Sequence, residues 1–186
     1  MSDFTPRLNS NGMENAPWWY SSGNIFYASG YGLPNCTCYA YGRYAEIRGA
    51  FAALPGGNGG DWYDAATGFE RGSTPALGAV ICYTSRSGEY DGHVAVVEII
   101  HEDGHLTTSN SAYGGTYFWV AEVYPENGYL ETWMTTQRDY YCQGFIYNDV
   151  TQGPGPSGKI PIWLLKYIKN KKEARLNVWK WCPLPV

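Results

Sequence analysis

Several short runs of apolar and other strand-compatible residues, separated by turn-forming residues, follow one another along the chain, a pattern typical of β-strands. The predicted strands cover residues 79–84, 93–100, 105–110, 117–124 and 142–147. Helix-compatible residues precede them from Cys36 to about Ala53, where the proline and glycines at 55–57 are expected to stop the helix. One or two helices at the front and an antiparallel sheet behind them make an α+β fold.

Two further segments complete the predicted domain. Residues 58–66 indicate a turn followed by a short helix with an acidic first turn. Residues 1–24 are polar and turn-rich, and we expect them to form an extended arm whose aromatic cluster, Trp18-Trp19-Tyr20, packs on the domain.

The charge is divided unevenly along the chain. Residues 1–150 contain six arginines, no lysine and sixteen carboxylates, a net charge of −10, whereas residues 151–186 carry +6. Glycine and proline dominate 151–158, which is typical of a linker, and 159–186 form a basic tail that contains tryptophan. We therefore predict a domain over 1–150, a linker over 151–158 and a tail over 159–186.

Three interpretations of the basic tail stay open. It binds an anionic polymer or a membrane surface, it attaches to a larger assembly, or it packs on the acidic domain. No nucleic-acid partner is expected.

The cysteines and the apolar stretches limit which metal sites, targeting segments and membrane spans the chain can contain. Five cysteines leave at least one unpaired unless it bonds another chain, and Cys82 and Cys142 lie in apolar runs that favour burial. Without a C-x-x-C spacing or a histidine pair at ligand spacing, we expect no metal and no cofactor. The first thirty residues lack an apolar run after a basic start, so no signal peptide is expected, and no apolar stretch is long enough to span a membrane.

Three residue types that suit thiol catalysis follow one another along the chain. Cys36 comes after a glycine-rich segment and a proline, at the expected first turn of the helix, where free N–H groups and the helix dipole favour a thiolate. His93 begins a predicted strand, and Asn110 lies in the next one. The order Cys, His, Asn is that of papain-like thiol hydrolases.

Side-chain alternation places His93 and Asn110 on one face of the sheet. A two-residue turn at 103–104 would set Val97 opposite Asn110 and leave His93 four residues away, so a bulge or a different loop register is required. The other two histidines, His101 and His105, flank this turn and are expected to be solvated.

Four ordered segments resemble the CHAP family of cysteine, histidine-dependent amidohydrolases and peptidases: residues 35–40, 78–80, 92–98 and 109–115. The resemblance runs from about residue 15 to 150 and implies a papain-like α+β domain, with the helix that carries the cysteine packed on an antiparallel sheet. It also implies cleavage of bacterial peptidoglycan, with Cys36 as nucleophile, His93 as base and Asn110 holding the imidazole. Cys38 stands where the family usually has tryptophan, so we assign it to packing, which leaves a second oxidisable thiol near the site.

The same resemblance suggests further site residues. The oxyanion would bind the backbone N–H of Cys36 and a second donor, for which Asn35 is a candidate. Candidate groove walls, each weighed against simple packing, are Tyr31, Trp62, Tyr113 and Trp119. Some phage members hold calcium on carboxylates around the cysteine, but residues 15–45 contain no Asp or Glu, so we expect no such site there.

The resemblance therefore implies a peptidoglycan hydrolase that cuts an amide bond, either the glycan–peptide amide or a link within the peptide stem or cross-bridge. For the basic tail 159–186 the candidate partners are then an anionic wall polymer, a membrane surface or phage tail proteins. We expect a phage endolysin or a tail-associated lysin of the virion, made in the host cytoplasm and acting at the wall after holin release or from the particle. The alternative is a virion structural or wall-adhesion protein on a CHAP scaffold with little turnover.

Overall fold

The computed structural model describes residues 4–126, 129–131 and 140–149. The helical segments are α1 (Pro17–Tyr20), α2 (Ile25–Ala28), α3 (Cys36–Arg48), the 3-10 turn η1 (Gly59–Asp61) and α4 (Trp62–Ala65). The strands are β1 (Arg71–Gly72), β2 (Val80–Ser85), β3 (His93–Ile100), β4 (Leu106–Asn110), β5 (Trp119–Glu126), β6 (Tyr129–Glu131) and β7 (Tyr140–Ile146). The predicted linker and tail lie outside the described residues.

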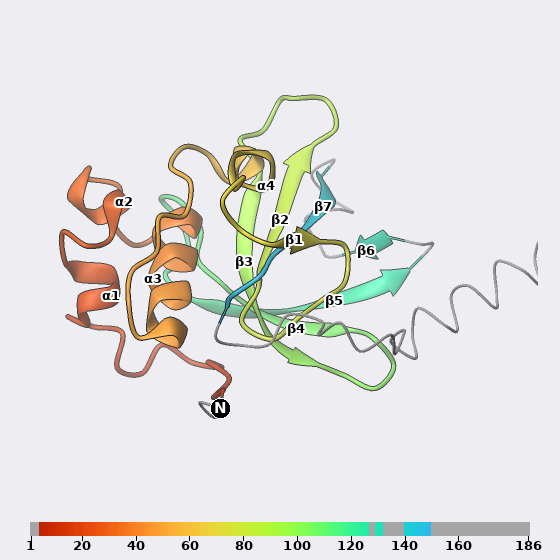
Figure 1. The fold of residues 1–186 in the computed structure, drawn as a ribbon, viewed down its shortest axis with the longest axis horizontal. Coiled ribbons are helices and arrows are strands. Elements are labelled where there is room, and N and C mark those ends of the chain that lie inside the picture. The colour runs from red at the N-terminus through yellow and green to blue at the C-terminus, as the bar shows by residue number, and fades with distance from the viewer. Residues whose placement is uncertain (1–3, 127–128, 132–139, 150–186) are drawn as a thin grey trace, which may run out of the picture.

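The strands form one antiparallel sheet in the order β1-β7-β2-β3-β4-β5-β6 (Figure 1). Each of the five predicted strands is present, and each begins within two residues of its expected start. The α+β prediction is confirmed. Within the described part of the chain, none of the helices combines the length and apolar character needed to cross a membrane.

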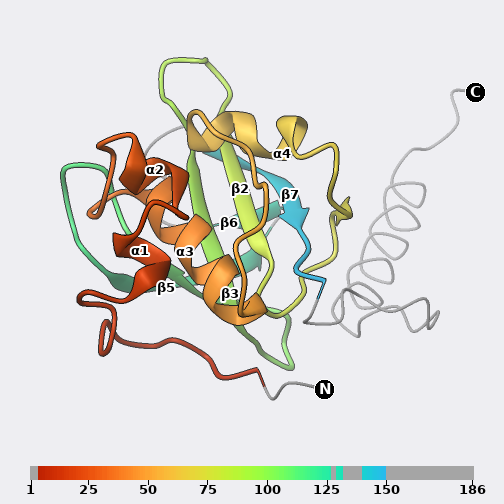
Figure 2. The ribbon, with the colours of Figure 1, turned by 60° about the vertical axis from the view of Figure 1, so that its left-hand side comes forward.

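The central strands β2 and β3 are buried on both faces, and their alternation sorts their side chains into two cores. Val80, Val94 and Val96 belong to the core that includes the buried residues of α3. Ile81 and Ala95, one position along, belong to a second core with residues of β4, β5 and β7. Figure 2 shows α3 in front of β3, with α1 and α2 beside it, so the helices lie on one face of the sheet.

Helix α3 has a defined cap at each end. The Asn35 side chain accepts hydrogen bonds from the backbone N–H groups of Thr37 and Cys38, which satisfies two of the unpaired donors of the first turn. Gly49 ends the helix in the left-handed conformation, with φ 72° and its N–H on the last turn. The prediction that the helix continues to about Ala53 is therefore wrong, because a glycine stops it before the proline is reached.

The N-terminal segment packs on the domain as predicted, but it is not extended throughout. Pro17–Tyr20 forms a turn of helix that buries Trp19 completely. The indole N–H of Trp19 donates to the Tyr39 carbonyl at 3.1 Å, and the two rings stack with centroids 6.0 Å apart. The aromatic cluster thus fixes this segment against α3.

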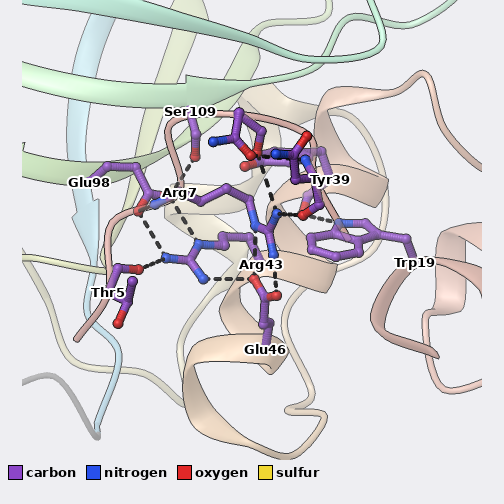
Figure 3. A network of polar contacts seen from close by, with 10 residues as sticks. Thr5, Arg7, Trp19, Tyr39, Arg43, Glu46, Glu98 and Ser109 are labelled. Carbon is purple, nitrogen blue, oxygen red and sulfur yellow. Dashed lines mark hydrogen bonds and ion pairs between the residues drawn. The ribbon is translucent and has the colours of Figure 1, made fainter. Parts of the chain in front are cut away.

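A buried carboxylate joins the helix, the sheet and the N-terminal segment (Figure 3). Glu98 on β3 is fully buried and accepts from Arg43 Nε at 3.0 Å and Nη2 at 2.9 Å. The Ser109 hydroxyl and the backbone N–H of Arg7 also donate to it, at 2.6 and 2.8 Å. Arg43 Nη1 also forms an ion pair with Glu46 Oε2, on the same helix, at 2.7 Å. Four donors on one carboxylate offset much of the cost of burying its charge.

Candidate active site

Cys36 is the first residue of α3, where the sequence predicts it. The backbone N–H groups of Thr37 and of Val94, the residue after His93, act on its sulfur and lower the pKa of the thiol. Burial acts against them and is the larger effect, so the pKa of Cys36 lies above its ordinary value. The helix N-terminus thus favours the thiolate, as expected from the sequence, and burial opposes it.

His93 and Asn110 are hydrogen-bonded to each other, with 3.1 Å between Nε2 and Oδ1. The Asn110 amide nitrogen donates to the Thr108 carbonyl and hydroxyl at 3.1 and 3.2 Å, which assigns Oδ1 as the atom facing the imidazole. An oxygen can only accept, so His93 carries its proton on Nε2 and keeps the lone pair on Nδ1. This is the tautomer that a proton acceptor toward a thiol requires.

Two register shifts bring Asn110 within reach of His93. The turn after β3 has three residues rather than two, since His101 and His105 pair across it. A bulge at Glu98 adds the second shift, after which Val97 lies opposite Thr108 and Val96 opposite Ser109. Asn110 is then diagonal to His93 on the same face of the sheet, and the prediction that a bulge or another loop register is required is confirmed.

The His93 ring lies between two aromatic rings and is shielded from water. Tyr83 is 6.3 Å away and Trp119 is 5.9 Å away, measured between ring centroids. This burial lowers the pKa of His93 to about 4, although the hydrogen bond to Asn110 acts in the opposite direction. His93 is therefore neutral at physiological pH.

Close backbone packing behind His93 requires glycine. A Cβ on Gly59 would lie 3.0 Å from the His93 backbone, and a Cβ on Gly92 would lie 2.3 Å from the Gly60 nitrogen. Gly92 also has φ +77°, a conformation that other residues adopt at a cost. The η1 turn thus packs directly on the backbone that carries the imidazole.

The loop after Asn110 is tied to the residues before Cys36. The Asn35 N–H donates to the Ser111 hydroxyl at 3.0 Å, and the Gly114 N–H donates to the Pro34 carbonyl at 3.3 Å. Ser111 was not singled out from the sequence, although its position next to Asn110 is a usable signal. These contacts fix the start of α3, which bears Cys36, relative to the end of β4, which bears Asn110.

Residues 26–112 match the family model described as the CHAP domain. This part of the chain is a CHAP domain. It contains Cys36, His93 and Asn110, together with the Asn35 cap and the glycines behind the imidazole.

Curated relatives share this segment. A Staphylococcus aureus protein named "Probable autolysin LDP" is 38% identical over 87 residues, covering 46% of this chain and 30% of that protein. "Staphylococcal secretory antigen SsaA" of the same species is 32% identical over 111 residues, covering 59% of this chain and 38% of that protein. The chain thus spans well under half the length of these relatives. A crystal structure of an N-acetylmuramoyl-L-alanine amidase from S. aureus overlaps 74% of this chain and 37% of its own, at a TM-score of 0.46 and 20% identity.

The candidates for groove walls differ in exposure. Tyr31 and Tyr113 are 54% and 71% exposed, with ring centroids 6.3 Å apart, on the two segments that the Pro34–Gly114 bond joins. Trp119 lies against His93. Trp62 is fully buried and stacks on Phe26, so the prediction that it lines a groove is wrong.

Two other residues of the CHAP domain have structural roles. Asn35 uses its side-chain oxygen as the helix cap, and its amide nitrogen donates to the Tyr31 carbonyl at 3.2 Å. Its side chain therefore positions Cys36, and the backbone N–H of Cys36 remains the better oxyanion donor. Cys38 is fully buried, as the assignment to packing requires, and burial raises the pKa of its thiol to about 12.

Acidification is expected to destabilise the wild type through His93. An unfolded histidine takes up a proton near pH 6.5, whereas folded His93 does so only near pH 4. The stability conferred by the neutral ring is thus complete above pH 6.5 and is lost as the pH falls toward 4. Between pH 7 and 4.5, urea unfolding should show the wild type losing about 2 kcal/mol more than His93→Gln, which has no ring to protonate. Equal losses in the two proteins would contradict the shifted pKa.

Proposed function

We propose that this CHAP domain is a thiol-dependent peptidoglycan hydrolase that cleaves an amide bond. The observation that carries the proposal is the His93–Asn110 bond, which leaves the imidazole Nδ1 without a proton. The backbone N–H of Val94, the residue after His93, acts on the Cys36 sulfur, so the two candidate residues belong to one site. The family match and the autolysin relative support the wall as the source of the substrate.

In the proposed reaction the proton moves with the attack, because burial favours the neutral form of both the thiol and the imidazole. His93 Nδ1 takes the Cys36 proton as the sulfur adds to the amide carbonyl carbon. The backbone N–H of Cys36, at the positive end of α3, donates to the oxyanion that forms. The C–N bond then breaks, His93 returns the proton to the leaving amine, and a thioester remains. Water, deprotonated by the same nitrogen, hydrolyses the thioester and restores the thiol.

Asn110 fixes the imidazole throughout this cycle. Its oxygen accepts from Nε2–H whether His93 is neutral or protonated, so the ring stays oriented as its charge changes. An amide holds the ring without adding a negative charge, and this agrees with the low pKa of His93. The exposed rings of Tyr31 and Tyr113 suit contact with the glycan or peptide of the substrate.

Product analysis tests the proposed function. Purified walls of S. aureus, the source of the relatives above, and of other Gram-positive species are incubated with the protein, and with heat-unfolded protein as control. Amide cleavage predicts new amino groups without new reducing sugar ends. New reducing ends would identify a glycosidase and contradict the mechanism, and identifying the amino acid whose amine is released separates an amidase from an endopeptidase. The phage origin and the route to the wall stay predictions.

A further inference from the structure

The turn between β3 and β4 gathers three groups that can bind a metal ion. A nitrogen of His101, a nitrogen of His105 and a carboxylate oxygen of Glu122 lie within 4.8 Å of one another. The histidines flank the turn, and Glu122 comes from β5, where it pairs with Thr107. The prediction that no histidine pair lies at ligand spacing is wrong for this pair. The turn stacks the two rings with centroids 3.7 Å apart, and both residues are half-buried rather than fully solvated.

The spacing already approaches that of a zinc site. His105 Nε2 and Glu122 Oε2 are 3.4 Å apart. Two ligands on one tetrahedral zinc ion are separated by roughly 3.3 Å when each bond is about 2.0–2.1 Å long. His101 Nε2 contacts the Thr107 hydroxyl at 2.8 Å, and that hydroxyl also contacts Glu122 at 3.1 Å. A small movement of the His101 ring toward the carboxylate would therefore complete a three-ligand set.

Asp103 orients His105 for this role. Its carboxylate contacts His105 Nδ1 at 2.5 Å and so holds a proton on that nitrogen. The other nitrogen, Nε2, then directs its lone pair toward Glu122, an arrangement that is repulsive unless a proton or a cation lies between them. A carboxylate on the outer nitrogen of a histidine is typical of metal sites. The Tyr124 ring, stacked on His105 with centroids 5.3 Å apart, further fixes the imidazole.

We propose that His101, His105 and Glu122 bind a divalent transition-metal ion, with zinc as the best fit, and that Asp103 holds His105 in position. Two imidazoles and one carboxylate suit zinc better than calcium or magnesium, which select oxygen ligands. His93 begins β3 and the turn follows its other end, roughly 23 Å away at about 3.3 Å per residue. The ion is thus separate from the candidate active site, and it fastens the β3–β4 turn to β5.

Thermal unfolding of chelator-treated protein tests the proposal directly. An ion that binds only the folded protein should raise the melting temperature by about 5–10 °C when free zinc is a hundredfold above its Kd. His105→Gln and Glu122→Gln should each abolish that shift. Circular dichroism without metal should show both variants folded, since they change half-buried or exposed side chains near a turn.

The turn itself offers a matched pair of variants. Asp103→Asn and Glu102→Gln each remove one exposed carboxylate from adjacent positions. Asp103→Asn should weaken zinc binding about 10–100-fold, because the outer hydrogen bond to His105 is lost, whereas Glu102→Gln should bind like the wild type. Equal weakening would overturn the role of Asp103 and indicate general attraction by negative charge.

Cobalt provides an independent test of the ligand set. Co²⁺ bound to two imidazoles and a carboxylate should give visible d–d absorption without a sulfur-to-cobalt charge-transfer band. A charge-transfer band would place the ion on a cysteine and overturn the site. The proposal is equally overturned if zinc causes no thermal shift, or if the shift survives in His105→Gln. Either result would mean that a proton shared between His105 and Glu122, and not a metal ion, explains why these two groups lie so close together.

Discussion

Replacing Cys36 by alanine is expected to reduce the release of amino groups from susceptible walls by about four orders of magnitude or more. In the proposed mechanism the Cys36 sulfur forms the thioester, and Cys36 is the residue that begins α3. The measurement is the initial rate of amine release from purified walls, with wild type and variant at equal folded concentration.

Cys38→Ala is the matched control. Cys38 lies two positions along the same helix, fully buried, and its thiol is held far from ionisation by that burial. This variant should lose about 1 kcal/mol of stability and retain most of its activity, since only packing atoms are removed. Equal rates for the wild type and Cys36→Ala would refute the thiol mechanism, and loss of activity in Cys38→Ala alone would reassign the nucleophile.

Arg43→Met is expected to reduce the free energy of unfolding by about 3–5 kcal/mol. The change leaves Glu98, which is fully buried, without its two-pronged cationic partner, so a charge is stranded in the core (Figure 3). Urea unfolding at pH 7 measures the loss. Adding Glu98→Gln to the variant should recover part of the stability, because the stranded charge is then removed.

Arg48→Met is the control for this experiment. Arg48 lies on the same helix and pairs with Asp149 at 3.0 Å, but the two side chains are 32% and 57% exposed. Solvent screens such a pair, so its loss should cost at most about 1 kcal/mol. If Arg43→Met and Arg48→Met cost the same, the buried network does not stabilise the fold as argued.

Much of this fold can be predicted from the sequence, because local patterns of residues determine where its elements begin and end. Short strand-compatible runs between turns located the strands, and the glycine-rich segment and proline before Cys36 located the start of α3. The spacing of His93 and Asn110 indicated a register shift, although it did not locate the bulge at Glu98. The Arg43–Glu98 pair was missed, since a single glutamate in an apolar strand gives no sign of whether it is buried.

Other features depend on contacts between distant segments. Trp62 and Tyr31 are both aromatic residues near glycines, so the sequence does not distinguish them. In the structure Trp62 packs on Phe26 and is buried, whereas Tyr31 is exposed. The histidines at the β3–β4 turn looked solvated because Glu122 is supplied by another strand. The end of α3 was placed too late because the conformation of Gly49, rather than the later proline, decides it.

The bulge at Glu98 separates the two ends of the β3–β4 hairpin. The bulge lies between the turn and the His93–Asn110 pair. The Glu98 carboxylate accepts a hydrogen bond from Arg43, which anchors the bulge to α3. The register at His93 is therefore set by that anchor as well as by the length of the turn. A change in turn length that kept the Glu98–Arg43 anchor in place would rebuild the cluster around His101, and the bulge would have to absorb the shift for His93 and Asn110 to stay aligned. The candidate active site and the proposed metal site would then share one pair of strands and still be altered separately.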